Sequence, residues 1–300
     1  IIFTTNTIKR LVGTTAADFR LEPITEKIGC VNGDTIQEVG GDILYLSPDG
    51  IRFLGATDRI GDFALDVASD NIFKDAQEFI ALSSEFSSVT IRNKAQYRIF
   101  AFVESQQAAS AKGLIATKFS AQSAGGVGWA TTKGIKAKVA DSIYTGDTES
   151  VMFGNDDGFI YIMDSGNSLD GDNIEAIYET PYMPITDSQT RKTLYKSTFY
   201  IQPTGAMSMQ LALKFDYDQR SFTGVIQPDA VTISTSGAGL AVFGNATYGA
   251  FVFGAILDTV YPTNLVGSFK TVAMRITDTS TNPTFTLDTA VLEFRQNDRQ

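Results

Sequence analysis

The stretch DILYLSPDGIRFLG, residues 42–55, has the sequence of a complete β-hairpin. Apolar residues fill 43–46, the turn residues Ser47, Pro48, Asp49 and Gly50 follow, and apolar residues return from Ile51. Proline presets φ, aspartate accepts hydrogen bonds from the nearby backbone, and glycine supplies the positive φ that a hairpin turn needs. A single hairpin is only marginally stable in water, so a chain that repeats it must stack its sheets on one another.

The same hairpin pattern recurs along the first part of the chain. Segments 1–13, 97–120 and 151–166 each run apolar, turn and return, with turns near residues 6, 49, 108 and 157 that lie about 43 to 59 residues apart. This spacing is typical of β-propeller blades. We therefore predict an all-β fold with a β-propeller-like domain over residues 1–173. The chain begins Ile1-Ile2-Phe3 within an apparent strand and without Met, so we expect a preceding segment to complete the blades.

Shorter elements are expected between the hairpins. Segments 35–40 and 87–92 have the pattern of connecting strands. Segment 69–82 has apolar residues at helical spacing and Asp70 as a candidate N-cap, which predicts one helix.

After residue 173 the pattern changes to longer strands with strict alternation. It is clearest at Met207, Met209, Leu211, Leu213, Phe215 and Tyr217. Period-2 alternation indicates strands with one buried face, so we predict a β-sandwich domain over residues 174–300. The glycine-rich stretch 237–254 within it is interpreted as a loop.

Composition excludes several kinds of function. The chain has no histidine and one cysteine, Cys30, so histidine-based catalysis, histidine-ligated zinc and an intrachain disulfide are excluded. The net charge of −10 opposes a protein that grips DNA phosphates but is compatible with a channel through which DNA slides. No apolar run approaches the length of about 18 residues that a membrane span needs, so no membrane insertion by this chain is expected. We expect no cofactor.

Acidic residues offer the remaining chemistry. Asp156, Asp157, Asp164, Asp170 and Asp172 are closely spaced. They suggest either a calcium site or, with better agreement to the local pattern, turn-forming residues. Paired carboxylates for glycoside hydrolysis stay open as an alternative. The available residues are Glu104, Asp141, Asp147 and Glu149.

One basic cluster precedes a predicted sandwich strand. Arg191, Lys192 and Lys196 lie close together in segment 187–196. They are candidates for an interface with an acidic neighbour or a phosphate, and the alternative is a solvated edge strand protected by its charge.

The order of segments resembles tail proteins of short-tailed bacteriophages. Segments 28–54, 158–205 and 269–300 are similar to the nozzle or tail tubular protein B group and to related hub proteins that stabilise packaged DNA. The similarity covers a Gly-Cys step at Gly29-Cys30, the SPDGIR hairpin, a DSGNSLDGDNI link and an ending on LEFRQNDR.

This resemblance implies a virion structural protein without enzymatic activity, located in the phage tail. It implies a homo-oligomeric six-fold ring that continues the portal and adaptor channel, retains and releases double-stranded DNA without binding it specifically, and offers attachment surface for tail fibres. Asp156, Asp157 and Asp164 are then candidate channel-lining acids. The alternative function is a carbohydrate-binding or polysaccharide-degrading β-propeller protein.

Overall fold

The computed structural model describes residues 1–55, 67–118, 127–218, 226–235, 260–263, 265–282 and 284–297. Contacts divide the chain into two compact units, the N-terminal unit Ile1–Ser165 and the C-terminal unit Gly166–Gln300. Both are built of β-strands, and the described residues contain one short α-helix. The chain is therefore all-β, as predicted. The division falls before the boundary after residue 173 that the strand pattern suggested.

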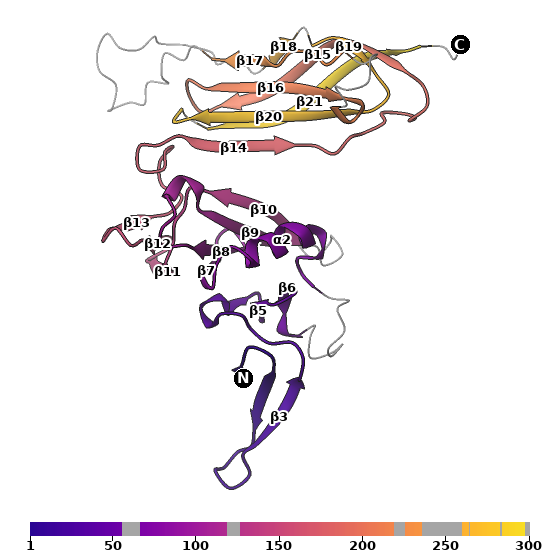
Figure 1. Ribbon diagram of the computed structural model, residues 1–300. Helices are drawn as coiled ribbons and strands as arrows, with labels where there is room; N and C mark the ends of the chain where they lie inside the picture. The colour runs from indigo at the N-terminus through magenta and orange to yellow at the C-terminus, as the bar shows by residue number, and fades with distance from the viewer. Residues whose placement is uncertain are drawn as a thin grey trace, which may run out of the picture. The chain divides into compact units, whose positions relative to one another are not determined.

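The N-terminal unit holds four small antiparallel sheets, which follow one another in chain order (Figure 1). The first sheet comprises β1 (Ile2–Phe3), β2 (Ile8–Val12) and β3 (Arg20–Thr25). The second comprises β4 (Gln37–Val39), β5 (Asp42–Ser47) and β6 (Gly50–Phe53). The third comprises β7 (Glu85–Ile91), β8 (Gln96–Phe102), β9 (Lys112–Lys118) and β10 (Val127–Lys133). The fourth comprises β11 (Val139–Thr145), β12 (Thr148–Gly154) and β13 (Ile160–Ile162).

Each of the four predicted hairpins is present, one in each sheet. In the hairpin of β5 and β6, Ser47 pairs with Gly50, which adopts a φ of 145°. The Ser47 hydroxyl donates to the Gly50 carbonyl oxygen at 2.8 Å, and the Arg52 Nε donates to Asp49 at 3.0 Å. The turn residues therefore act through backbone geometry and local hydrogen bonds, as their sequence indicates.

The predicted helix is shorter than segment 69–82. A 3₁₀ turn, η3 (Asp70–Ile72), leads into α2 (Phe73–Ile80). The prediction that Asp70 caps the helix is wrong, because Asp70 lies inside the 3₁₀ turn and no side chain caps α2. The helix buries Ala76 and Phe79, and Phe79 packs into the cluster shared by the second and third sheets.

Buried clusters link the four sheets in series. Ile8 of the first sheet packs with Tyr45 of the second. Leu46 of the second sheet packs with Ile99 of the third, and Phe100 of the third packs with Val151 of the fourth. Among the described residues, no buried cluster joins the fourth sheet back to the first, and no sheet closes into a barrel.

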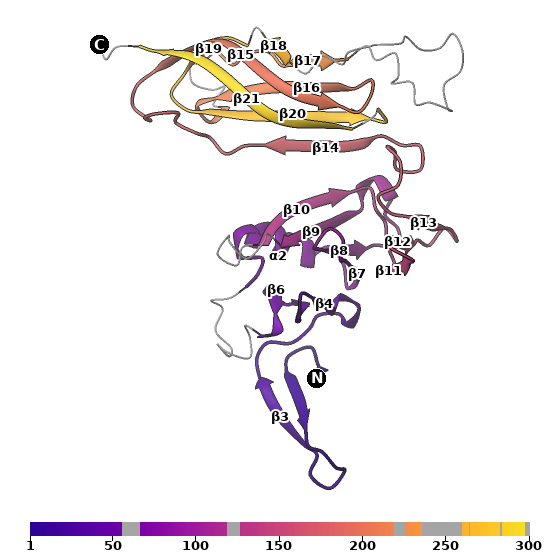
Figure 2. The same ribbon diagram turned by 180° about the vertical axis from the view of Figure 1, so that it is seen from behind.

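The described residues of the C-terminal unit form two sheets (Figure 2). The fifth sheet has the order β14 (Ile174–Glu179), β20 (Val272–Ser280), β16 (Ser208–Phe215) and β17 (Val231–Ser234). In the sixth sheet, β15 (Lys192–Pro203) pairs with β18 (Val260–Thr263), β19 (Gly267–Phe269) and β21 (Phe285–Gln296). The strands predicted after residue 173 are present.

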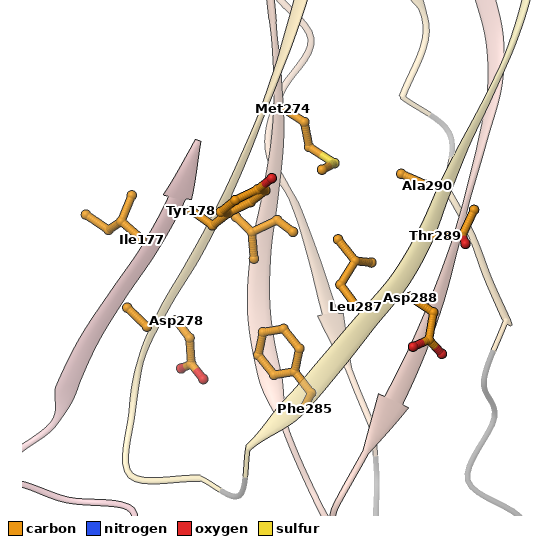
Figure 3. A pocket seen from close by; sticks show the side chains of 11 residues that line it. Ile177, Tyr178, Met274, Asp278, Phe285, Leu287, Asp288, Thr289 and Ala290 are labelled. Atoms are coloured by element: carbon orange, nitrogen blue, oxygen red, sulfur yellow. The ribbon is translucent and has the colours of Figure 1, made fainter. Parts of the chain in front are cut away.

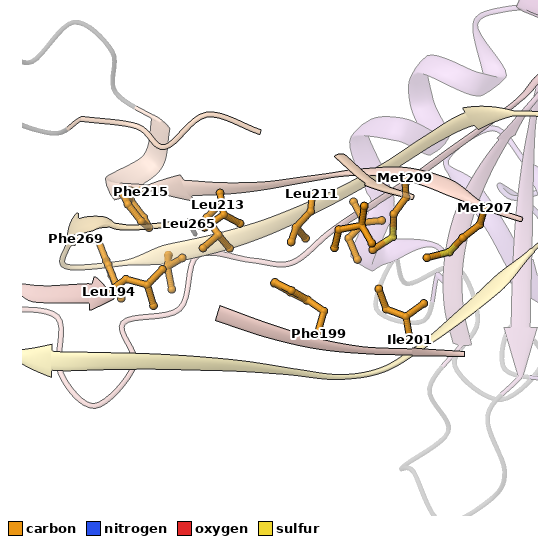
Figure 4. Close-up of a cluster of buried hydrophobic side chains, with 13 residues drawn as sticks. Leu194, Phe199, Ile201, Met207, Met209, Leu211, Leu213, Phe215, Leu265 and Phe269 are labelled. Atoms are coloured by element: carbon orange, nitrogen blue, oxygen red, sulfur yellow. The ribbon is translucent and has the colours of Figure 1, made fainter. Parts of the chain in front are cut away.

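The two sheets share one core, seen in Figure 4. Phe199 and Ile201 of β15 point toward the side chains of Met209, Leu211 and Leu213 on β16. The predicted alternation is confirmed from Met207 to Phe215. It is wrong at Tyr217, which is exposed and has a φ of 64° in the 3₁₀ turn η5 (Asp216–Asp218) after the strand.

Two further expectations concern membranes and the glycine-rich stretch. None of the helices among the described residues is long and apolar enough to cross a membrane. The predicted loop 237–254 lies outside the described residues.

Candidate functional site

Asp156 is held by a lysine from the same unit. The Lys136 Nζ lies 2.7 Å from the Asp156 carboxylate and 2.8 Å from the Glu104 carbonyl oxygen, and the Lys136 side chain is buried. The hydrogen bond from Lys136 lowers the pKa of Asp156. This acid therefore fixes the turn between β12 and β13 to the segment that precedes β11.

Asp157 is engaged within the same turn. It accepts hydrogen bonds from the Phe159 backbone nitrogen at 2.9 Å and from the Tyr161 hydroxyl at 2.7 Å, and both lower the pKa of Asp157. Gly158 adopts a φ of 86° beside it. The turn-forming interpretation of this segment is confirmed here.

Asp164 binds two basic side chains of the N-terminal unit. It receives two parallel bonds from the Arg98 guanidinium, at 2.8 and 2.7 Å, and one from the Lys94 Nζ at 2.6 Å. The Arg98 side chain is almost fully buried in the third sheet. Burial raises the pKa of Asp164, but the hydrogen bonds from Arg98 and Lys94 outweigh it, and the net direction is down. A two-pronged bond to a buried arginine is a structural ion pair.

The acids that suggested calcium do not form a metal site, and two of the acids that suggested glycoside hydrolysis lie on opposite faces of one sheet. Among the described residues, no group of three or more potential metal ligands gathers at one point. Asp141 and Glu149 lie on opposite faces of the fourth sheet, because Asp141 pairs with Met152 whereas Glu149 pairs with Tyr144. Glu149 accepts the backbone nitrogens of Arg92 and Asn93, at 3.0 and 2.8 Å. These two carboxylates therefore cannot flank one glycosidic bond.

The three basic residues do not form one exposed cluster. Lys192 is 0% exposed, and its Nζ donates to the carbonyl oxygens of Asp187, Thr190 and Lys270. Lys196 is half-exposed and lies 3.3 Å from Glu293 of β21, and Arg191 donates to the Ser268 carbonyl oxygen. Lys192 thus belongs to the interior of the C-terminal unit, on the inner face of β15. The sequence prediction missed this because the carbonyl groups that bind its Nζ include Lys270, which is far away in the chain.

The largest feature that the sequence prediction missed is one face of the fourth sheet. Residues paired across strands share a face, so the register places one apolar set together. We call this set, with its single acid, the fourth-sheet face: Val139, Asp141, Ile143, Met152, Ile160 and Ile162. Val139 is 63% exposed, Ile160 77% and Ile162 62%. An exposed apolar face of this kind marks a contact site for a protein, a membrane or a ligand.

The opposite face of the fourth sheet is the packed one. Val151 and Phe153 contact the third sheet, and Ser142 donates to the Thr90 carbonyl oxygen at 2.9 Å. Tyr161 stacks on Phe153 with ring centroids 5.2 Å apart. Strands β11 to β13 therefore have apolar residues on both faces of their sheet. Within the described residues, only one of these faces packs against another sheet.

The C-terminal unit has an apolar pocket of about 460 Å³ between β14, β20 and β21 (Figure 3). Tyr178, Met274, Phe285 and Leu287 line it. Asp278 and Asp288 lie on opposite sides of Phe285 in this view. Both carboxylates are engaged locally, since Ser280 donates to Asp278 and Gln202 donates to Asp288, each at 2.6 Å.

No protein-family model matches this sequence, and no curated protein matches it.

Proposed function

We propose that this chain is a structural protein of a short-tailed bacteriophage virion, without enzymatic activity. It forms a homo-oligomeric ring of the nozzle or hub type, of six copies, that continues the channel of the portal and adaptor proteins. Double-stranded DNA is retained and then released through the lumen without specific binding, and the outside of the ring offers attachment surface for tail fibres.

The observation that carries this proposal is the fourth-sheet face. Five apolar side chains from three adjacent strands are exposed to water on a sheet whose other face packs against the third sheet. Burying such a face against another protein is favourable by roughly 25 cal/mol per Å² of apolar surface. The resemblance of segments 28–54, 158–205 and 269–300 to phage nozzle proteins then suggests which kind of assembly buries it.

The finer architecture belongs to the same proposal. We interpret the four serial sheets of the N-terminal unit as propeller-like blades and the two sheets of the C-terminal unit as a β-sandwich. Consecutive antiparallel sheets joined in chain order, each containing hairpin connections, support the first interpretation. A core contributed by β15 and β16 from different sheets supports the second.

The contacts of the acids change which residues should be tested as channel-lining groups. Asp156 and Asp164 neutralise Lys136 and Arg98 within the chain, so a reversal of either charge would also break a structural ion pair. Asp170 is exposed and has no ion pair among the described residues. We expect Asp170→Lys to slow DNA ejection if this acid faces the lumen, because a cation there would bind phosphates. Unchanged ejection kinetics would argue against that placement.

The proposal is tested by imaging the 300-residue chain in negative stain, alone and mixed with the portal and adaptor proteins of a short-tailed phage. Closed rings with an open centre are the expected result. Particles that stay single under both conditions would refute the assembly.

The pocket of Figure 3 favours one alternative, a carbohydrate-binding protein. An aromatic ring beside carboxylates can hold a sugar through stacking and hydrogen bonds, and Tyr178 with Asp278 offers that chemistry. Titration with bacterial surface polysaccharide would decide it: binding by the wild type that Tyr178→Ala abolishes would support this alternative, and no heat of binding would remove it.

A further inference from the structure

Among the described residues, the first and the fourth sheet each have one exposed apolar face. The fourth-sheet face is one of them. The other belongs to the first sheet, where Ile2 pairs with Lys9, Lys9 with Pro23, and Leu11 with Leu21. We call these five residues the first-sheet face. Ile2, Leu11 and Leu21 are all about half-exposed.

In both sheets, the opposite face packs against the neighbouring sheet. In the first sheet, Ile8 and Phe3 lie on the opposite face and pack with Tyr45 of the second sheet. In the fourth sheet, Val151 and Phe153 pack with the third sheet. A sheet in the middle of a series has neighbours on both faces, whereas the first and last sheets each have one. Among the described residues of the N-terminal unit, these two faces are therefore the ones without a neighbouring sheet.

The two faces carry opposite charges. Asp141 lies in the fourth-sheet face in one row with Met152 and Ile162, and its carboxylate accepts only the backbone nitrogen of Ser142 among the described residues. Lys9 lies in the middle of the first-sheet face and has no ion pair among the described residues.

The other charged groups in the strands of these two sheets are already engaged on the opposite faces. Arg10 and Arg20 bind Glu22 at 3.1 and 2.9 Å, and Glu149 is bound by backbone nitrogens. One acid and one base thus remain, each surrounded by apolar residues.

We infer that the fourth-sheet face of one copy packs on the first-sheet face of the next copy, with Asp141 opposite Lys9. This inference rests on the proposed function, because it names the contact that would build the proposed ring. The contact is heterologous, since two different surfaces meet, and a repeated heterologous contact closes into a ring when its rotation divides a full turn. The apolar residues supply the driving force, and the single ion pair sets the register.

Charge reversal in two separate chains tests the contact. Lys9→Glu places an acid opposite Asp141, and Asp141→Lys places a base opposite Lys9, so each variant alone should assemble at a concentration about tenfold higher than the wild type. When the two variants are mixed, every contact in an alternating ring joins opposite charges, because it brings together either the two native side chains or the two reversed ones. Assembly should therefore return to the wild-type concentration in the mixture. Sedimentation velocity over a concentration series measures this.

Matched controls make the same charge changes elsewhere. Asp147→Lys changes the β11–β12 turn of the same sheet, and Lys27→Glu changes an exposed lysine after the first sheet. Both should assemble as the wild type does. All these side chains are at least partly exposed, so the far-UV circular dichroism of each variant should be unchanged.

The outcomes separate this inference from the proposed function. If the wild type forms rings and both single variants form them equally well, the contact is wrong and the ring proposal stands. A second result would also overturn the inference: the single variants fail to assemble, their mixture fails as well, and only a chain that carries both reversals recovers. The two faces would then meet within one chain. If the wild type forms no ring under any condition, the proposed function fails together with it.

Discussion

Strand β16 and the fourth sheet have the same alternating pattern and opposite surroundings. The inner row of β16 packs on β15 from the facing sheet, and Leu211 and Phe199 are fully buried there. In the fourth sheet the mostly apolar face includes Ile160 and Ile162 of β13, which are exposed. Alternation therefore indicates that a strand has two distinct faces, but burial depends on whether a second sheet is present to cover the apolar one. The difference separates residues that stabilise the chain from residues available to a partner.

The largest effect is expected where two sheets share a core. Phe199→Ala should lower the free energy of unfolding of the C-terminal unit by about 3–5 kcal/mol, because it removes a fully buried ring and leaves a cavity. The adjacent Tyr200 points to the other face of β15 and is 40% exposed, so Tyr200→Ala is the control and should cost less than about 1.5 kcal/mol. Urea unfolding followed by fluorescence measures both. Equal losses would mean that the two faces of β15 are not distinguished by burial.

A smaller effect is expected from the ion pair that joins Asp164 to the third sheet. Asp164→Asn should cost about 2 kcal/mol at neutral pH, because it leaves the buried Arg98 without its full counter-charge. Asparagine tolerates the positive φ of 59° found at this position, so backbone strain does not contribute. The control is Asp170→Asn. Asp170 has a similar φ of 53° but no ion pair among the described residues.

The same pair predicts a dependence on pH. The pKa of Asp164 is lower in the folded chain than in the unfolded one, so its stabilisation is fully present above the unfolded pKa of about 3.9 and is lost as pH falls through the folded pKa. The midpoint of thermal unfolding, followed from pH 6 into acid, should fall less steeply for Asp164→Asn than for the wild type. Parallel curves for the two would show that this carboxylate does not contribute to acid sensitivity.

The hairpin of β5 and β6 should respond to Gly50→Ala by a loss of about 1–3 kcal/mol in the free energy of unfolding. A Cβ at Gly50 would lie 2.6 Å from the Ser69 hydroxyl oxygen, and the φ of 145° disfavours any side chain. The control is Gly33→Ala, where an added Cβ meets open space. Chemical unfolding measures the decrease in the free energy of unfolding for both variants. A larger decrease for Gly50→Ala than for Gly33→Ala would show that the backbone conformation of the turn requires glycine.

The sequence could predict what depends on local pattern. Turn residues such as Pro48 and Gly50 predicted the hairpins, and alternation predicted the strands of the C-terminal unit, because both signals arise within a few residues. It could not predict that Lys192 is buried or that Asp164 binds Arg98, since these depend on contacts between residues far apart in the chain. The prediction that Asp70 caps the helix was wrong because a 3₁₀ turn precedes the helix. Sequence spacing does not distinguish such a turn from the first turn of an α-helix.

The candidate surface was beyond prediction for a further reason. Val139, Asp141 and Ile143 alternate as a buried strand would, and nothing within these residues reports whether a covering sheet follows. Only the register across β11, β12 and β13 places Ile160 and Ile162 on the same face as Met152. A functional surface built from three strands becomes visible when their pairing is known.

Ile160→Asp should have the smallest effect on stability and the clearest effect on assembly. Ile160 is 77% exposed, so the free energy of unfolding of the isolated chain should change by no more than about 0.5 kcal/mol. Placed on a face that a second copy covers, the new carboxylate would be buried without a partner and should abolish ring formation. The control is Ile226→Asp, because Ile226 is 86% exposed in the C-terminal unit and outside the first-sheet and fourth-sheet faces. Unfolding curves and sedimentation profiles of the two variants give the comparison. If Ile160→Asp lowered the free energy of unfolding without changing assembly, the fourth-sheet face would contribute to the stability of the chain and not to a contact between copies. Ile226→Asp would then differ from Ile160→Asp only in its unfolding curve.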